Sequence, residues 1–473
     1  MRSVGLIRSI ILGCVVFIPA LAVRANAQSA GGVRAAPYYV APDGNDKNTG
    51  SLGSPFLTLA KAQSAMRASG TKTTCIRAGA YQLDGPLNLT SFDNGETWQY
   101  YPPDGVDSAV LEGGNKLLRV IDIEGGSNIT INGLKLEHFV DYGIFGAGSA
   151  NSGAGPVASG ITVENCDVGF NTTTNWSSAG IGFLAATPRT AIKNNYVHDV
   201  GSMGISFNTY FSPADSIGGS VIANNVVLRA VQRMYDGGGI YVSMHGGYQA
   251  GPGGVVVANN FVRDQGSIGL AGPYGASVIG IYLDDNANNV TVTGNIVGPP
   301  AEGSITGKND NDVTAILVHD GRDNHISGNI VDLGDSGMVS TVVWGYDPAS
   351  IAGMAGNTFT GNIVISSFTG VQRTSSSGIT GYSYVENAQP ASDFTIHGNL
   401  YFNYAGGQVR TDGPITSDGS PTVENPQVSG WTYTIAGGSP VFGAPVNFPP
   451  IAGNWGPPGY VIPRTGTAPS CPK

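Results

Sequence analysis

Residues Ser220–Val231 read SVIANNVVLRAV, and residues Val255–Gly266 read VVVANNFVRDQG. Each stretch has an alternating apolar strand, a corner that contains Asn, and a second alternating strand. Short β-branched runs separated by turn residues are typical of β-strands. The same pattern recurs elsewhere in the chain, in Asn128–Phe139, Gly160–Asn171, Thr190–Gly201, Asn289–Pro300, Asn324–Gly334, Asn357–Ser367 and Asp393–Asn403.

The corners of these copies are regularly spaced, 30 to 37 residues apart, at Gly133, Asn165, Asn195, Asn225, Asn260, Asn295, Asn329, Asn362 and Asn399. A third short strand lies between successive corners, and these strands begin at Gly143, Gly180, Gly204, Gly239, Gly280, Ala315 and Val342. Three strands per turn, stacked turn on turn, predict an all-β fold, a single-stranded right-handed parallel β-helix of about nine or more coils. A β-propeller needs four strands in each blade of about 40–50 residues and fits this spacing less well.

The two ends of the chain depart from the repeat. Residues 1–27 have a basic start, an apolar run and a small-residue cleavage site at Ala27, which predict a secretory signal peptide. We expect residues 28–127 to form the N-terminal segment and cap of the β-helix, with a capping helix over Phe56–Ala68. Residues 128–404 would form the core of the parallel β-helix, and residues 405–473 would form an irregular C-terminal coil and tail.

Composition limits the classes of partner. The full chain has a net charge of −10. Cleavage of the predicted signal peptide would remove three arginines and no acidic residues. A chain this acidic is a poor ligand for nucleic acid or for anionic membranes. Cleavage would leave Cys75, Cys166 and Cys471, from which at most one disulfide is expected, without a preferred pairing. The leader predicts a secreted or periplasmic protein, and the oligomeric state stays open.

Several segments resemble a known superfamily. Residues Pro37–Ala62 (PYYVAPDGNDKNTGSLGSPFLTLAKA) and the following Arg77–Tyr81 resemble the N-terminal motif of secreted β-helix proteins of the pectate-lyase-like superfamily. This superfamily contains lyases, hydrolases, epimerases and non-catalytic adhesins, so the resemblance implies the fold more specifically than the activity.

Two central segments, Tyr235–Tyr241 (YDGGGIY) and Gly280–Asp285 (GIYLDD), resemble segments of β-helix glycoside hydrolases that act on xylosides or fucosides. In some of these enzymes an aspartate of the second segment is the nucleophile, which implies this role for Asp284. The xylosidase-like partner is a Glu one coil later, where this sequence has His319. The fucosidase-like partner is the Asp of the first segment, which corresponds to Asp236.

The alternation of the third strands indicates which side chains share the outer face. When these strands are aligned on Ile205, Ile240, Ile281 and Ile316, residues two positions apart point to the same side. The outer face would then carry a polar patch that includes Asn208, Tyr241, Ser243, Tyr282, Asp284 and His319. Earlier coils place Phe145, Ala147 and Leu184 there, so the change in polarity marks the expected groove.

Paired carboxylates are the groups that glycoside hydrolysis requires. Adjacent coils lie ~4.8 Å apart, which suits either a retaining or an inverting pair. We take Asp236 as general acid/base and Asp284 as nucleophile or base, with Asp285 and Asp320 as the alternative pair. Expected sugar-binding residues are Tyr241, Tyr282, Asn208, His245, His319, Asp320 and Arg233. Asp236, Asp285 and Asp320 are also typical of simple turns, and Tyr241 and Tyr282 could equally form an aromatic ladder.

Three functions remain open. The first is a secreted glycoside hydrolase for a plant or microbial glycan. The second is a polysaccharide lyase, in which Asp285, Asp320 and Asp347 would hold Ca²⁺ through oxygen ligands, with Arg322 or Lys308 nearby. The third is a glycan-binding adhesin without catalysis. A carbohydrate is the expected partner in each, no nucleotide, zinc or other cofactor site is expected, and no membrane association beyond the leader.

Overall fold

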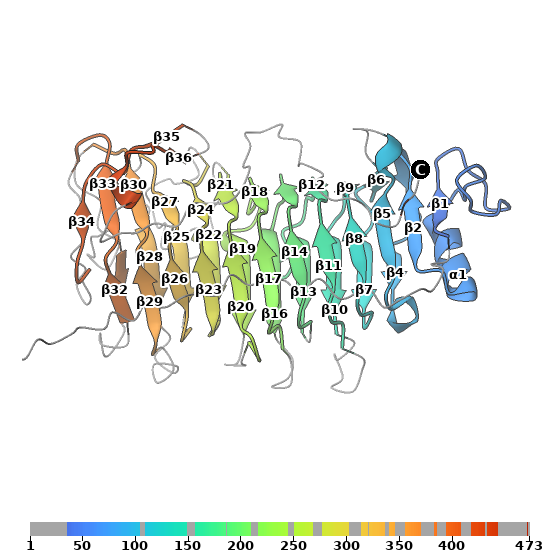
Figure 1. Cartoon of the computed structure of the whole chain (residues 1–473), viewed down its shortest axis with the longest axis horizontal. Coiled ribbons are helices and arrows are strands. Elements are labelled where there is room, and N and C mark those ends of the chain that lie inside the picture. Colours follow the sequence, from blue (N-terminus) through green and yellow to red (C-terminus); the bar gives the residue numbers. More distant parts are fainter. Residues whose placement is uncertain are drawn as a thin grey trace, which may run out of the picture. The chain divides into compact units, whose positions relative to one another are not determined.

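The chain was analysed as a computed structural model, which describes residues 36–104, 109–148, 157–185, 187–209, 216–244, 250–267, 277–301, 314–319, 321–335, 340–345, 355–369, 383–385, 394–407, 418–430, 433–442 and 471. The predicted signal peptide, residues 1–27, lies outside this part. Residues 36–473 form one compact unit, in which short strands stack coil upon coil (Figure 1).

Three parallel sheets run the length of the stack, as the repeat predicts. Sheet 1 contains β1 (Tyr38–Val40), β2 (Thr73–Ile76), β5 (Thr97–Tyr100), β8 (Thr130–Asn132), β11 (Thr162–Glu164), β14 (Ala191–Lys193), β17 (Ser220–Ala223), β20 (Val255–Ala258), β23 (Val290–Thr293), β26 (His325–Ser327), β29 (Asn357–Thr360) and β32 (Phe394–His397). Sheet 2 contains β3 (Gly79–Gln82), β6 (Ala109–Glu112), β9 (Leu134–Glu137), β12 (Asp167–Gly169), β15 (Tyr196–His198), β18 (Val226–Leu228), β21 (Phe261–Arg263), β24 (Ile296–Val297), β27 (Ile330–Asp332), β30 (Ile363–Ser366), β33 (Leu400–Asn403) and β34 (Thr422–Val423). Sheet 3 contains β4 (Leu87–Leu89), β7 (Arg119–Glu124), β10 (Tyr142–Ala147), β13 (Ala179–Leu184), β16 (Met203–Thr209), β19 (Asp236–Met244), β22 (Ser277–Asp284), β25 (Thr314–His319), β28 (Ser340–Gly345) and β31 (Ser383–Val385).

The register of sheet 3 is the one that the isoleucines predict. Ile205 pairs with Ile240, Ile240 with Ile281, and Ile281 with Ile316, and all four are fully buried. The alternation rule therefore assigns the inner and outer faces of these strands correctly. The three sheets also start before residue 128, with β1 and β2 already in place within the N-terminal segment.

Glycine precedes the inward isoleucine in each of five consecutive coils. A Cβ atom at these positions would come within 2.4–2.6 Å of a valine Cγ1 atom of sheet 2, so no larger residue fits there without a shift. The glycines are Gly143, Gly180, Gly204, Gly239 and Gly280, and they face Val168, Val197, Val227, Val262 and Val297. In these five strands the glycine and the following isoleucine therefore both face the interior, which interrupts the alternation of the strand near its start.

A ladder of buried asparagines joins the corners between sheets 1 and 2. Each side-chain amide of this ladder donates to the Oδ1 atom of the next Asn, at 2.9–3.0 Å, along Asn195, Asn225, Asn260, Asn295, Asn329, Asn362 and Asn399. Asn399 donates in turn to Oδ2 of Asp418 at 2.8 Å, where the ladder ends.

The left-handed backbone conformation falls on the residue before each ladder Asn, for example Asn194 (φ 56°) and Gly294 (φ 65°). Asn165 also has a left-handed φ and aligns with Asn194, so Cys166 occupies the ladder position in that coil. The sequence-based alignment of Asn165 with Asn195 was therefore off by one residue. Two consecutive polar corner residues made both alignments plausible, and only the buried ladder distinguishes them.

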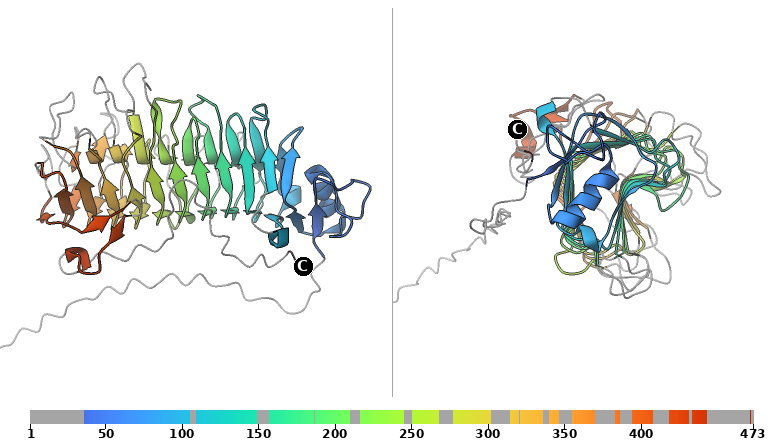
Figure 2. Two further views of the ribbon diagram at one scale, coloured as in Figure 1. Left: turned by 90° about the horizontal axis from the view of Figure 1, so that it is seen from above. Right: turned by 90° about the vertical axis from the view of Figure 1, so that its right-hand side faces the viewer.

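Helix α1 (Leu59–Ser69) covers the first coil with buried Leu59, Ala62 and Met66 (Figure 2). It begins three residues later than the predicted Phe56, because Thr58 is its N-cap and accepts from the amide of Lys61. No helix among the described residues is long and apolar enough to cross a membrane.

Two described parts of the C-terminal segment contact the stack. Val428, Tyr433 and Val441 pack on the apolar outer side of sheet 2, and Cys471 forms a disulfide with Cys75 in β2. Cys166 is buried and carries no disulfide. The C-terminal segment therefore does not contact the last coil alone, because the disulfide links Cys471 to Cys75 at the N-terminal end.

Candidate active site

The candidate site lies on the outer face of sheet 3, where β22 and β25 end. Asp284 pairs in register with Ser243 on one side and lies beside His319 on the other. Although it is on the outer face, Asp284 is only 8% exposed. Its carboxylate is thus a nearly buried charge, which requires hydrogen-bond partners.

Four groups supply these partners. Oδ1 of Asp284 lies 2.7 Å from Nδ1 of His319 and accepts from the amide of Asp285 at 2.8 Å. Oδ2 accepts from the hydroxyl of Tyr241 at 2.7 Å. The hydroxyl of Tyr282 also hydrogen-bonds to Asp284. Asp284 is therefore held in one position from both neighbouring coils.

Asp236 is the first residue of β19 and pairs in register with Ser277, whereas Asp284 pairs with Ser243 at the other end of these two strands. Strict alternation from Ile240 would turn Asp236 inward, but the interrupted alternation at Gly239 changes the phase. A Cβ at Gly239 would point at Val262 of the interior, whereas one at Gly238 would lie 3.0 Å from Cβ of Tyr282 on the outer face. Asp236 lies two residues before Gly238, so it points to the same side of the strand as Gly238, and it is partly exposed.

Tyr282 connects the two acids. Burial first, and then the charges of Asp284 and Asp236, raise the pKa of the Tyr282 hydroxyl well above its usual value. Both carboxylates therefore act on one phenol that stays neutral and able to donate. The ring of Tyr282 contacts that of Tyr241 edge to face, at 5.2 Å, so the two tyrosines form an aromatic pair and also position Asp284.

The other predicted residues are more scattered. Asp285 ends the strand with a left-handed φ of 46° and accepts from Oγ of Ser243 at 3.4 Å. Arg233 is exposed, lies beside Gly201 and forms no ion pair with any residue that the structure describes. Predicted residues outside the described part of the chain are His245, Lys308, Asp320 and Asp347.

Buried acceptors without partners lie one coil before Tyr241. Ser206 is in register with Tyr241, and Asn208 with Ser243. Their exposed fractions are 1% and 4%, and Oγ of Ser206 and Oδ1 of Asn208 have no hydrogen-bond partner among the residues that the structure describes. Such atoms are rare in folded proteins and need an explanation. Asn208 is one of the residues that the sequence predicts to bind sugar.

An aromatic pair beside Asp236 was not predicted. Trp176 is 48% exposed, and its ring contacts that of Tyr235 edge to face at 4.7 Å. Both residues lie in turns that precede strands of sheet 3, where the alternation rule does not apply. The signal that could have revealed Trp176 is a large aromatic residue within a run of Asn, Thr and Ser.

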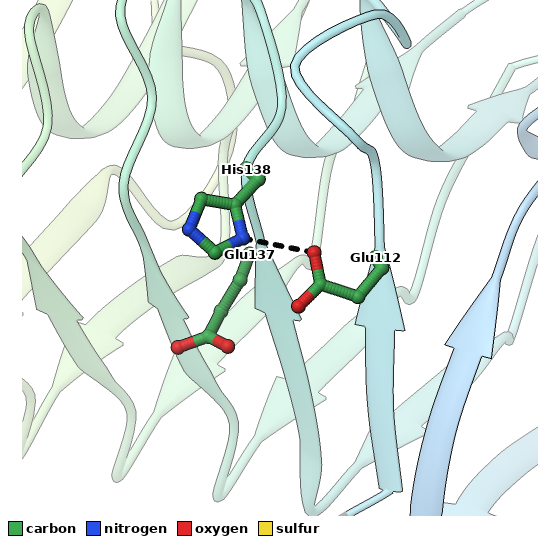
Figure 3. A group of neighbouring side chains, drawn as sticks. All are labelled: Glu112, Glu137 and His138. Carbon is green, nitrogen blue, oxygen red and sulfur yellow. Dashed lines mark hydrogen bonds and ion pairs between the residues drawn. The ribbon is translucent and has the colours of Figure 1, made fainter.

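Within the described part of the chain, two clusters combine two carboxylates with one histidine. Asp284, Asp285 and His319 have ligand atoms within 4.8 Å of one another, and so do Glu112, Glu137 and His138. In the second cluster, on sheet 2, Glu112 and His138 are 2.8 Å apart (Figure 3), and Glu137 pairs with Lys135 at 2.7 Å. Calcium prefers oxygen ligands alone, so the histidine in each cluster favours a transition metal over Ca²⁺ as an occupant.

A cavity of about 400 Å³ lies at the N-terminal end, between α1 and the connection from β3 to β4. Its lining is mostly apolar and includes Leu59, Tyr81 and Leu87, with Asp84 as its one carboxylate. Without a second acid it offers no pair for hydrolytic chemistry.

Comparisons with known proteins found one family model and several solved structures of low sequence identity. Residues 119–331 match the family model of the right handed beta helix region. A structure described as a glycoside hydrolase is 10% identical, with a TM-score of 0.48 over 79% of this chain and 97% of that chain. XylC in complex with xylose is 12% identical (TM-score 0.45, 83% and 87%), and pectate lyase Pel9A is also 12% identical (TM-score 0.45, 86% and 90%).

None of the curated proteins matches this sequence. The family model covers the coils that carry Asp236 and Asp284, and the three stacked parallel sheets extend the same architecture on both sides of it. This chain is a right-handed parallel β-helix protein.

Proposed function

We propose that this protein is a secreted carbohydrate-active enzyme, a glycoside hydrolase that uses Asp236 and Asp284 on the outer face of sheet 3. The observation that supports this most directly is the nearly buried carboxylate of Asp284, which Tyr241 and His319 hold on the outer face. The charge of Asp236, on the adjacent coil, also raises the pKa of the Tyr282 hydroxyl. Two acids on one wall, from adjacent coils, are the minimum equipment for cleavage of a glycosidic bond.

The surroundings of the two acids suggest separate roles. Asp284 is held by Tyr241, Tyr282, His319 and its own neighbouring amide, which suits a nucleophile or a base that must keep one position. Asp236 would act as the general acid and give its proton to the glycosidic oxygen as the bond to the anomeric carbon breaks. Asp284 would then attack that carbon or take a proton from the attacking water.

The compartment follows from two independent features. Residues 1–27 have the pattern of a secretory signal, and Cys75 and Cys471 form a disulfide, which persists in oxidising compartments. Both support a secreted or periplasmic location. We expect the protein to be recovered from the culture medium or the periplasm, without the signal peptide and with the disulfide intact.

The test is a screen of chromogenic glycosides and polysaccharides with the parent protein, Asp236→Asn and Asp284→Asn. We expect new reducing ends with the parent and their loss in both variants. Products that absorb in the ultraviolet, released only with calcium, would instead indicate a lyase. Glycan binding with no turnover in the parent would indicate an adhesin, and either result contradicts the hydrolase.

A further inference from the structure

The aromatic pair of exposed Trp176 and partly buried Tyr235 lies next to the candidate acid. Tyr235 directly precedes Asp236, the first residue of β19, and Trp176 lies three residues before β13. Strands β13 and β19 are two steps apart in sheet 3, so the pair bridges coils ~10 Å apart. The aromatic surface therefore adjoins the acid on the side of the earlier coils.

The segment that carries Trp176 is held by hydrogen bonds to neighbouring residues. The hydroxyl of Thr173 donates to Asp141 at 2.8 Å, and that of Ser178 donates to the carbonyl of Asn175 at 2.7 Å. The hydroxyl of Tyr142 donates to the carbonyl of Ser177. An indole that is half exposed on a well-anchored turn adds little to the core, yet its position is fixed in advance.

The buried acceptors point to the same kind of ligand. Ser206 and Asn208 belong to β16, the strand between β13 and β19. Oδ1 of Asn208 can only accept a hydrogen bond, so it requires a ligand that carries donors. Ser206 and Asn208 lie further along the strands than the aromatic pair, in register with Tyr241 and Ser243. A sugar chain presents C–H groups on the faces of its rings and hydroxyl donors at their edges, so separate rings of one chain match the aromatic pair and these acceptors.

We propose that Trp176 and Tyr235 form a stacking subsite for a sugar ring, and that the substrate is an oligosaccharide or polysaccharide chain that crosses the coils from β13 to β22. This inference rests on the proposed function and names its substrate class. The stacked ring is uncharged, because Asp236 lies beside the subsite and would repel a uronate.

The test compares Trp176→Ala with the parent and with Phe170→Ala. Phe170 is also exposed, at 39%, but lies on sheet 2 against His138 and His198, so it is a matched control. Affinity for neutral oligosaccharides of increasing length is measured by calorimetry in the Asp284→Asn background. We expect Trp176→Ala to weaken binding of the longer chains by roughly tenfold or more, and Phe170→Ala to leave it unchanged.

Turnover is measured in parallel on the same glycans. Trp176→Ala should raise KM for polysaccharides, and the increase in KM should grow with the length of the glycan. If Trp176→Ala keeps full affinity while the parent hydrolyses the chain, the subsite is refuted and the hydrolase stands. If Trp176→Ala loses affinity but the parent never turns over, the subsite stands and the hydrolase fails. A parent that binds no neutral oligosaccharide refutes the subsite outright.

Discussion

The two carboxylate–histidine clusters contain the same kinds of group but differ in what surrounds them. On sheet 3, Asp284 accepts from two tyrosine hydroxyls, and a further acid lies close to one of these hydroxyls. On sheet 2, Glu137 is neutralised by Lys135, and His138 stacks on an exposed Phe170. The difference teaches that neighbours decide what such a cluster can do: a lysine makes an ion pair, whereas hydroxyls leave a carboxylate available for chemistry.

The strongest way to break this comparison is to neutralise one acid in each cluster. Asp284→Asn should lower kcat on any glycan substrate by about a thousandfold or more, because a positioned carboxylate contributes on that scale. Glu137→Gln in the sheet 2 cluster should change kcat by less than about twofold. Equal losses in the two variants, with folding verified by circular dichroism, would show that the clusters do not differ as proposed.

The disulfide affects the end of the molecule nearer the sheet 2 cluster. Cys471→Ser should lower the free energy of unfolding by about 2–5 kcal/mol, because a link between residues so distant in sequence restricts the unfolded chain. Amide exchange should accelerate in β2 and β5, with little change in β22. Cys75→Ser should lower the free energy of unfolding by the same amount, and the double variant should lower it no further. If the double variant instead loses the sum of the two single-variant losses in free energy of unfolding, the disulfide between Cys75 and Cys471 is contradicted.

The N-terminal end should also respond to pH. Glu96 is fully buried near Asp93, and this burial, reinforced by the charge of Asp93, raises its pKa to about 7. The folded state therefore holds this proton more tightly than the unfolded state, and stability is lost as the pH rises from about 4.5 to 7. The loss is at most about 3 kcal/mol.

Chemical denaturation at several pH values measures this loss. Glu96→Gln should flatten the profile and raise stability at pH 8, because the amide carries no proton to lose. Glu124→Gln, in which the replaced acid is an exposed residue of β7, is the control and should keep the parent's slope. A Glu96→Gln profile as steep as that of the parent would assign the pH dependence to other groups.

The smallest effect is expected from the ion pair that distinguishes the sheet 2 cluster. Lys135→Ala should reduce the free energy of unfolding by about 1 kcal/mol or less, since Lys135 is partly exposed and such pairs contribute little. Glycan turnover should not change. A loss of turnover would mean that the sheet 2 cluster takes part in function, and it would remove the contrast between the two clusters.

The sequence predicted those features that depend on a period. The columns of Ile240 and Ile281, and the contact of Asp284 with His319, follow from alternation along strands of constant register. The outward position of Asp236 depends on the interruption of alternation at Gly239, and alternation itself cannot signal such an interruption. Trp176 and Tyr235 lie in turns, whose spatial neighbours are set by loop geometry.

The ends of the chain illustrate the same limit. Cys75 and Cys471 are 396 residues apart, and no local pattern relates residues so distant. The start of α1 at Leu59 was set by Thr58 and its hydrogen bonds, a boundary that apolar spacing defines only to within a few residues.

The asparagine ladder has a direction, and this has a consequence for how the chain can change in length. Every inner rung both gives and receives a hydrogen bond, so a whole coil could be duplicated or deleted between Asn195 and Asn362 without leaving a rung unsatisfied. Asp418 only receives, because a carboxylate has no proton to pass on. It therefore acts as a stop, and growth of the protein by added coils would have to occur upstream of it.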